Sequence, residues 1–375
     1  MQIIHCPYRI CPLGAHVDHQ YGIVTGFALD HGVTLEYEPT QDGTIYVTSK
    51  NYVGIVNCTL TDLPERKMYW GDFLIGAVHT LSRKYQLEFG IKGEITGSLP
   101  TGGLSSSAAV IITYLSALCR ANAIHLTEAE LIKHAIWEER NYIGVNVGKL
   151  DQSCEVYSRK EHLLYLDTLD DSCELIPISS NMPEFEIAVI FSGLERSLAG
   201  SAYNMRVDEC RAAAYALKAF SHMEYGKYQD TYLRDVPEGI YDEYKNKLPE
   251  SWYKRARHFY TEMQRVKLGK KAWKQGDIEK FGRLITESGE SSIHYYQTGS
   301  DQLHYLQELI KGTKGIYGGR FSGAGFNGSS MAIINPEYKE EIEETIKKCY
   351  LKQYPELKDS FKITFCQTAD GVDLV

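Results

Sequence analysis

A glycine- and serine-rich stretch early in the sequence carries the residue types that bind phosphate. It runs from Gly97 to Ala109 and reads GSLPTGGLSSSAA, between a strand-like run at 91–95 and a helical pattern at 108–119. Backbone N–H groups at a helix start bind anions, glycines let the chain approach a phosphate closely, and hydroxyls contact phosphate oxygens or Mg²⁺. The expected phosphate loop consists of Gly102, Gly103, Leu104, Ser105, Ser106 and Ser107. A serine-capped helix after a flexible turn is the plainer alternative, but the register of glycines, serines and alanines is narrower than a cap requires.

A second glycine-rich stretch raises the question of a dinucleotide site. Gly323, Gly325 and Gly328 form a GxGxxG pattern, which in dinucleotide-binding folds opens a helix. Here the pattern leads into the strand-like run SSMAII, so we interpret it as a glycine-rich hairpin that leans over a ligand at Gly323 and Gly325. The sequence has neither GxxxxGKS nor GxxxxGKT, so it does not predict a P-loop enzyme.

Length and composition indicate a globular protein of two domains. The chain has 375 residues, more than one hydrophobic core usually serves, so we expect domains at 1–180 and 181–375 with a ligand site between them. The net charge of -9 and the lack of a basic run argue against a nucleic-acid partner. Nine scattered cysteines without a CxxC pair fit reduced thiols, and no apolar run approaches the roughly 18 residues of a membrane helix. We therefore expect a soluble cytoplasmic protein with no membrane partner and no obligate protein partner.

The hydrophobic pattern changes between strand and helix spacing along the chain. Short β-type runs dominate the first 60 residues, and helical spacing then covers Trp70 to Leu87. Thr127 with Glu130 forms a capping-box pattern before a helix that ends near Gly144, and another helix is expected to begin near Gly148. The second half is predicted to be mostly helical, with helices at 202–222, 252–275, 277–293, 300–311 and 336–350 and strands at 187–191, 315–321 and 330–334.

Five segments follow one another in an order that is typical of a known family. They are PYRICPLGAHVDH at 7–19, LPTGGLSSSAA at 99–109, EERNYIGVNVGKLDQ at 138–152, SLAGSAY at 197–203 and GGRFSGAGFNG at 318–328. In these segments the chain resembles the GHMP kinases, specifically their galactokinase branch, over nearly its whole length. The resemblance implies a two-domain α+β fold in which the serine-rich loop holds ATP and a sugar lies between the domains. The implied reaction is phosphorylation of the anomeric hydroxyl of that sugar.

The resemblance also implies roles for individual residues. Asp151 corresponds to the catalytic aspartate, which acts as general base or orients the anomeric oxygen. Arg9 corresponds to the arginine that neutralises developing charge and keeps Asp151 ionised. Ser107 and Glu139 correspond to the ligands of Mg²⁺. The expected sugar contacts are His16, Asp18, Gly148 and Tyr203. Without the resemblance, Asp151 would be read as a helix-start residue and Glu139 as one solvated charge among several.

One position departs from the galactokinase pattern. Galactokinases carry a glutamate before the histidine of the first motif, where it contacts the C6 hydroxyl of galactose, and here that residue is Ala15. A glutamate would repel a sugar with a C6 carboxylate, because two like charges in contact do not both ionise readily. The first motif looks most like that of the galacturonokinases, so we expect conversion of D-galacturonate to galacturonate 1-phosphate, with galactose as the alternative substrate. Arg196 and Lys149 are cations close in sequence to site residues, and neither is assigned to the carboxylate.

Two other interpretations remain open at this point. The string His16-Val17-Asp18-His19 could bind zinc or iron in a hydrolase, although such a site needs further ligands and no second cluster stands out. Some galactokinase-like proteins sense a sugar without turning it over. A sensor predicts a damaged phosphate loop or a missing base, whereas GLSSSAA and Asp151 are intact here.

Overall fold

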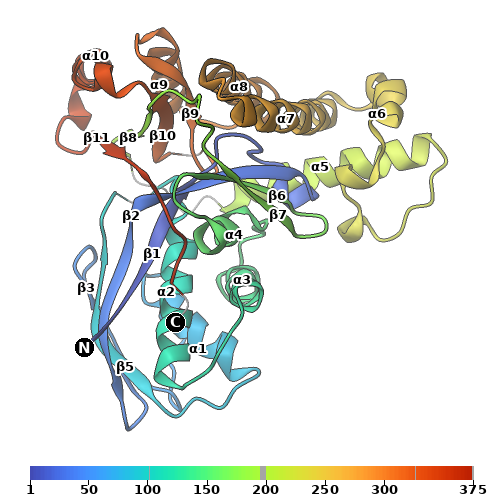
Figure 1. The fold of residues 1–375 in the computed structure, drawn as a ribbon. Helices are drawn as coiled ribbons and strands as arrows, with labels where there is room; N and C mark the ends of the chain where they lie inside the picture. The colour runs from blue at the N-terminus through green and yellow to red at the C-terminus, as the bar shows by residue number, and fades with distance from the viewer. Residues whose placement is uncertain (101, 195–199, 326, 374–375) are drawn as a thin grey trace.

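One long strand, β2 (Ile23–Thr40), organises the first of two β-sheets. The computed structural model describes residues 1–100, 102–194, 200–325 and 327–373, the side chains of 200–202 excepted. β2 pairs antiparallel with β1 (Gln2–Ile10) and β5 (Gly90–Gly97), and its first residues pair with β6 (His162–Asp167). The sheet order is β4-β3-β5-β2-β6-β7, with β1 and β12 also on β2 (Figure 1). Its other strands are β3 (Thr44–Ser49), β4 (Ile55–Thr59), β7 (Ser172–Pro177) and β12 (Thr368–Ala369).

Side-chain alternation explains how β2 buries one face. Val33, Leu35 and Tyr37 are almost fully buried, whereas Glu36 and Glu38 between and after them are exposed. In a strand, successive side chains point to opposite faces, so this pattern places the apolar residues toward the covering helices. The helices on that side are α1 (Asp72–Ser82), α2 (Ser106–Ala121), α3 (Glu128–Trp137) and α4 (Leu150–Tyr157) (Figure 1).

Two of these helices position the predicted site. α2 packs against β1 and β2 and begins directly at the serine run of the predicted phosphate loop. α3 begins at a capping box, in which Thr127 accepts from the backbone N–H of Glu130 and the Glu130 side chain reaches back. α3 then continues as a π-helical turn, Glu138–Ile143, and ends at Gly144 in the left-handed conformation. π-Turns inside helices often mark functional positions, because they re-aim side chains.

The second half of the chain forms a smaller sheet and most of the long helices. The sheet is antiparallel with the order β11-β8-β10-β9. Its strands are β8 (Glu186–Phe191), β9 (Ile316–Phe321), β10 (Ser329–Ile334) and β11 (Lys362–Cys366). The helices are α5 (Gly200–Phe220), α6 (Glu238–Tyr244), α7 (Glu250–Gln275), α8 (Ile278–Ser291), α9 (Asp301–Gly312) and α10 (Lys339–Gln353).

The two halves share a hydrophobic core. Trp273 of α7 is fully buried, and its ring lies 5.2 Å from that of Phe27 on β2. The end of the chain also returns to the first sheet: β12 pairs with β2, and Val372 N–H donates to the carbonyl of Glu155 on α4. The predicted division at 180/181 stays a prediction, and the last strand lies with the N-terminal sheet.

Most predicted elements are present at the expected places, which confirms the α+β class. The helical pattern from Trp70 forms a shorter helix, Asp72–Ser82, because residues 83–89 turn back toward β5. A hairpin of β6 and β7, which was not predicted, lies between α4 and β8. The GxGxxG pattern lies between β9 and β10, which are antiparallel neighbours, so it forms a hairpin and not a dinucleotide-binding turn.

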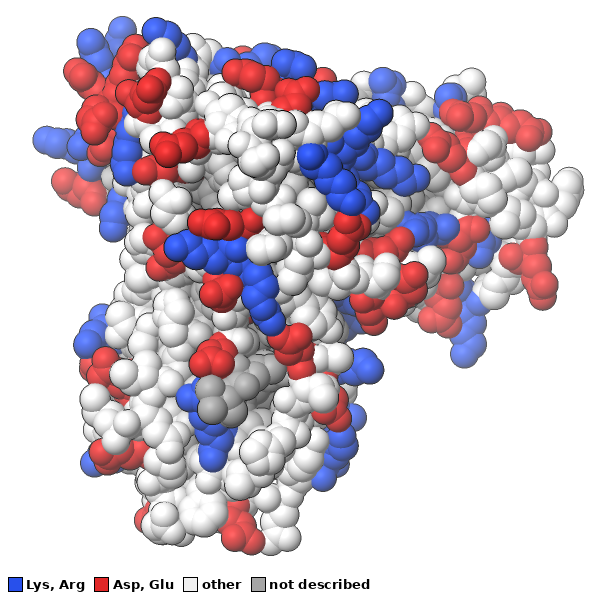
Figure 2. Space-filling model, viewed as in Figure 1, with Lys and Arg blue, Asp and Glu red and all other residues white. Residues whose placement is uncertain are grey.

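The surface carries charges of both signs. Figure 2 shows Lys and Arg side chains interspersed with Asp and Glu on this face, so the net charge of -9 is not gathered there into one acidic surface. Among the residues that the structure describes, no helix has the length and apolar character needed to cross a membrane. All nine cysteines are free thiols.

Candidate active site

The predicted site residues meet in one pocket between the N-terminal sheet, the starts of α2 and α4, and the β9–β10 hairpin. The pocket has an empty volume of about 900 Å³, including space open to solvent. The predicted residues that line it are Arg9, Ala15, His16, Asp18, Gly103, Ser105, Ser107, Glu139, Asp151, Tyr203, Gly323 and Gly325. Four other predicted residues, Gly102, Leu104, Ser106 and Gly148, are not part of this lining. Residues from five segments of the sequence thus line one pocket.

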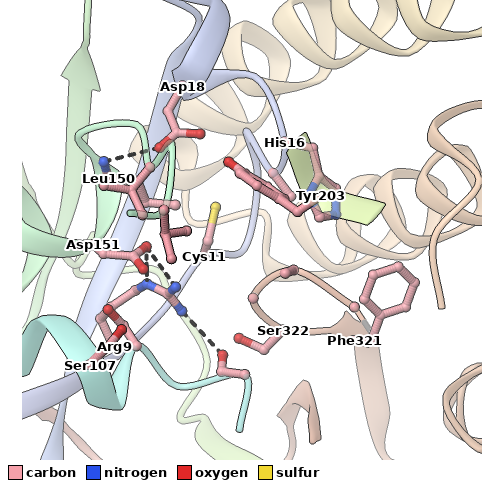
Figure 3. Close-up of a pocket in the computed structure, with 18 of the residues that line it drawn as sticks. Arg9, Cys11, His16, Asp18, Ser107, Leu150, Asp151, Tyr203, Phe321 and Ser322 are labelled. Atoms are coloured by element: carbon pink, nitrogen blue, oxygen red, sulfur yellow. Dashed lines mark hydrogen bonds and ion pairs between the residues drawn. The ribbon is translucent and has the colours of Figure 1, made fainter. Parts of the chain in front are cut away.

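A buried ion pair forms one wall of the pocket. Arg9 on β1 donates from Nε and Nη2 to Oδ1 of Asp151 at 2.9 and 2.6 Å, and from Nη1 to the Gly103 carbonyl at 3.2 Å (Figure 3). Arg9 is 3% exposed, whereas the Asp151 side chain is 25% exposed and faces the pocket. Burial alone would lower the pKa of Arg9, but the Asp151 carboxylate more than offsets this and raises it. The pair therefore holds a permanent cation beside a carboxylate whose Oδ2 can face a ligand.

The phosphate loop packs directly on the backbone of the glycine-rich hairpin. Gly102 and Gly103 have φ angles of 132° and 80°, which residues other than glycine rarely adopt. A Cβ on Gly103 would lie 2.9 Å from the Ser322 carbonyl, and one on Gly323 would lie 2.8 Å from the Gly103 Cα. The two glycine motifs are therefore needed for the same close contact. Ser105, before α2, makes no side-chain capping bond, so it does not occupy the first N–H groups of that helix.

A hydroxyl and a carboxylate meet at the start of α2. Ser107 Oγ donates to Glu139 Oε1 at 2.8 Å, and Gln152 Nε2 donates to Oε2 of the same carboxylate at 2.7 Å. Glu139 is 3% exposed and lines the pocket from the π-helical turn. This arrangement distinguishes Glu139 from its neighbours, which the sequence could not do. Arg140 turns outward, where it donates to the Val147 carbonyl.

The neighbouring Glu138 lies away from the pocket. Its carboxyl group is fully buried against Gly76 and Tyr142, and burial, followed by the charge of Glu139, raises its pKa well above the usual value. Because the neutral form is favoured, Glu138 is a poor ligand for a cation. Of the two adjacent glutamates, only Glu139 presents oxygens to the pocket.

Asp18 is held on the far side of the pocket from Ser107 by the turn before α4. The backbone N–H of Leu150 donates to Asp18 Oδ2 at 3.3 Å (Figure 3). A Cβ at Gly148 would lie 1.9 Å from that same oxygen, so a larger residue there would displace the Asp18 carboxylate. Burial, and then the charge of Asp151, raise the pKa of Asp18. Gly148 therefore acts through Asp18, and Asp18 offers a partly buried carboxylate to a polar ligand.

Histidines of the first motif pack on aromatic rings. His16 adopts a φ of 60° and stacks on Tyr296 at 4.4 Å between ring centroids, and His19 Nε2 lies 3.0 Å from the Tyr296 hydroxyl. Burial lowers the pKa of His16 well below its usual value and that of His19 to about 3. Among the described residues, the three ligand atoms that cluster within 4.8 Å belong elsewhere, to Asp30, His31 and Cys366. This geometry does not support a metal-hydrolase site at His16-Val17-Asp18-His19.

Similarity to known proteins agrees with the geometry of the pocket. Residues 72–159 match the GHMP kinases N terminal domain. The chain is 35% identical to a galacturonokinase of Arabidopsis thaliana over 99% of this chain and 93% of that protein. It is 30% identical to a galactokinase of Thermotoga neapolitana over 99% of both proteins. The chain belongs to the GHMP kinase family, in its galactokinase branch.

Solved structures show the same fold. Galactokinase of Lactococcus lactis complexed with galactose superimposes with a TM-score of 0.90 at 24% identity. The match covers 100% of this chain and 95% of the galactokinase chain. Mevalonate kinase of Methanococcus jannaschii superimposes with a TM-score of 0.67 at 16% identity, with 98% of each chain covered. The two-domain GHMP kinase architecture therefore describes this chain.

Several residues that line the pocket of this GHMP kinase were not predicted. Cys11 points its thiol into the pocket between Arg9 and His16 (Figure 3), and burial raises its pKa to about 12. Arg320 and Ser322 flank Phe321 at the end of β9. The sequence shows Arg320 as a cation beside a glycine-rich turn. Its burial depends on packing against α8, and no pattern in the sequence predicts that contact. Lys149 pairs with Asp171 at 2.5 Å and is not part of the lining, and Arg196 lies outside the described residues.

Proposed function

We propose that this GHMP kinase transfers the γ-phosphoryl group of ATP to the anomeric hydroxyl of D-galacturonate, forming galacturonate 1-phosphate. The observation that carries this proposal is the pocket itself, which joins the Arg9–Asp151 pair and the phosphate loop to an alanine at position 15. The similarity to a galacturonokinase over nearly the whole chain supports the same substrate. The cytoplasmic location expected from the sequence stays a prediction.

Asp151 and Arg9 would act on the attacking oxygen. The anomeric oxygen forms a bond to the γ-phosphorus, the bond from that phosphorus to the β,γ-bridging oxygen breaks, and ADP leaves. The hydroxyl proton passes to the Asp151 carboxylate, or is held by it until the new bond has formed. Arg9 holds the carboxylate at Oδ1 and places positive charge beside the oxygens that gain negative charge.

The phosphate loop and the Ser107–Glu139 pair would hold the nucleotide and Mg²⁺. A hydroxyl and a carboxylate 2.8 Å apart are oxygen ligands of the kind that Mg²⁺ prefers, and they leave coordination positions for water and phosphate. When bound, Mg²⁺ supplies charge neutralisation on the phosphates. Gln152 fixes the Glu139 carboxylate by its hydrogen bond, so the ligand oxygen is oriented before the ion arrives.

The sugar would lie between Asp18, His16, Tyr203 and the hairpin at Gly323 and Gly325. Asp18 would accept hydrogen bonds from ring hydroxyls. The hydrogen bond from the Leu150 N–H fixes the direction of its carboxylate. The close packing of the hairpin on the phosphate loop keeps the sugar next to the γ-phosphate.

Galactose is the second candidate substrate. The relatives include galactokinases at 30% identity, and the structural neighbour with a TM-score of 0.90 is a galactokinase complexed with galactose. Measured kcat/KM values with ATP for D-galacturonate, D-galactose and L-arabinose would decide between them. We expect galacturonate to give the highest value. A higher value for galactose would reassign the substrate, and binding of a sugar with no turnover of any would indicate a sensor.

A further inference from the structure

Arg320 is a buried cation that faces the sugar pocket. It lies near the end of β9, is 1% exposed and belongs to the lining of the pocket. Nη1 donates to Ser288 Oγ at 2.5 Å, Nη2 to Ser292 Oγ at 3.0 Å and Nε to the Phe321 carbonyl at 3.0 Å. A guanidinium has five N–H donors, so in the described part of the protein one N–H on each Nη is left over. Two such donors are the number that a two-pronged carboxylate contact uses.

The charges around Arg320 do not balance. Within the described residues no ion pair joins Arg320 to a carboxylate, and Ser288, which accepts from Arg320, donates to Glu262 Oε1 at 2.6 Å. Glu262 is itself paired with Arg265 at 2.7 Å. Burial would raise the pKa of Glu262, but Arg265 and its other neighbours lower it to about 2, so it carries one negative charge. Two guanidinium groups therefore share one carboxylate, and a buried positive charge without a partner is costly.

The surroundings of Arg320 leave room for an anion. Ala15 and Cys11 line the same pocket with small side chains, and the Cys11 thiol donates to the Leu13 carbonyl. His16 Nε2 and Ser322 Oγ also line the pocket, and both are buried polar atoms with no hydrogen-bond partner in the described part of the chain. Burial raises the pKa of Cys11, and the charge of Arg320 opposes that rise. Burial lowers the pKa of His16, and the charge of Arg320 lowers it further. Arg320 therefore lies close to both side chains.

We propose that Arg320 determines the preference for a sugar acid by receiving its C6 carboxylate, with His16 and Ser322 adding hydrogen bonds. This assignment rests on the proposed function, because it places the anomeric hydroxyl of the sugar at Asp151. The C6 group is attached to a different ring carbon, so its subsite must be separate from Asp151 and still within the pocket. Arg9 is the other arginine in the described lining, and Asp151 already neutralises it.

Affinities for a charged and a neutral form of one sugar test this assignment. The probes are D-galacturonate, its methyl ester, which is neutral at C6, and D-galactose. Calorimetric Kd values would be measured for the wild type, Arg320→Met and Arg320→Lys. We expect the preference for the acid over the ester to fall about tenfold or more in Arg320→Met, and by less in Arg320→Lys, which keeps the charge but loses the planar fork.

Arg255→Met is the matched control. Arg255 is equally buried at 1% exposure, but it pairs with Glu209 and does not line the pocket. Its acid-to-ester ratio should equal that of the wild type. If Arg320 had only a structural role, Arg320→Met would weaken the binding of all three sugars by the same factor. An unchanged acid-to-ester ratio would therefore overturn the assignment. A wild type that binds galacturonate with this preference but does not phosphorylate it would refute the proposed function and leave the assignment standing.

Ala15→Glu provides a second test should the Arg320 variants fail to fold. The new carboxylate would lie in the same pocket as Arg320 and compete with the sugar carboxylate for it. We expect the acid-to-ester ratio to fall about tenfold or more. A folded Ala15→Glu protein that retains the ratio of the wild type would contradict the assignment.

Discussion

Replacing Asp151 with asparagine separates the structural and chemical roles of the ion pair. Asparagine keeps an oxygen that can accept from Arg9 Nε and Nη2, but it removes the negative charge and the ability to take a proton. Breaking a fully buried pair costs about 3–5 kcal/mol. Because the Asp151 side chain is 25% exposed and the acceptor is retained, we expect Asp151→Asn to lower the free energy of unfolding by about 1–2 kcal/mol. Loss of a general base lowers turnover by roughly 10²–10⁴-fold.

Urea denaturation and steady-state kinetics on the same preparation would test both numbers. Calorimetry should show that the folded variant still binds the sugar. Asp167→Asn is a matched control, because Asp167 forms a similarly buried pair with Arg234 at 2.5 Å and does not line the pocket. It should lose similar stability and keep its turnover. If Asp151→Asn retained the turnover of the wild type, Asp151 would not be the base; if both variants lost turnover equally, the loss would come from stability.

Three further predictions follow from the geometry. Gly148→Ala places a Cβ 1.9 Å from Asp18 Oδ2 in the unrelaxed structure, so KM for the sugar should rise about tenfold or more, and an unchanged KM would show that Asp18 does not contact it. Glu139→Gln should raise the Mg²⁺ concentration for half-maximal activity about tenfold or more, whereas Glu138→Gln, which resembles the neutral Glu138, should not; equal responses would reject the assignment of the ligand. Burial lowers the pKa of His258 from 6.5 to about 4, so unfolding below pH 6.5 takes up a proton. The free energy of unfolding should therefore decrease as the pH is lowered. His258→Gln should reduce this slope between about pH 6.5 and pH 5 by up to about 1.4 kcal/mol per pH unit, as measured by urea denaturation, and an unchanged slope would contradict it.

Short-range patterns in the sequence were enough to locate the loops and helix starts of the site. The capping box at Thr127 and the glycines of both motifs follow from local backbone requirements, which a sequence records directly. The resemblance to a family then supplied Asp151 and Arg9 as partners, although 142 positions separate them. Their contact depends on the packing of α4 behind β1, which no local spacing specifies.

Other parts of the site depend on long-range packing and could not be predicted. Glu138 and Glu139 are indistinguishable by type, and only the π-helical turn decides which one faces the pocket. Arg320 lies in the segment GGRFSGAGFNG, but that it lacks a carboxylate partner of its own is seen only from its contacts with Ser288 and, through Ser288, with Glu262. Lys149 is close in sequence to residues of the site, but in the structure it forms an ion pair with Asp171.

The identity of the product shows whether this protein phosphorylates the anomeric oxygen of galacturonate. The wild-type protein would be incubated with ATP, Mg²⁺ and D-galacturonate, and the mixture followed by ³¹P NMR with proton coupling retained. We expect a new sugar phosphate whose phosphorus couples to the anomeric proton and which appears in step with ADP. A signal coupled to another ring proton, or a product with galactose and none with galacturonate, would contradict it.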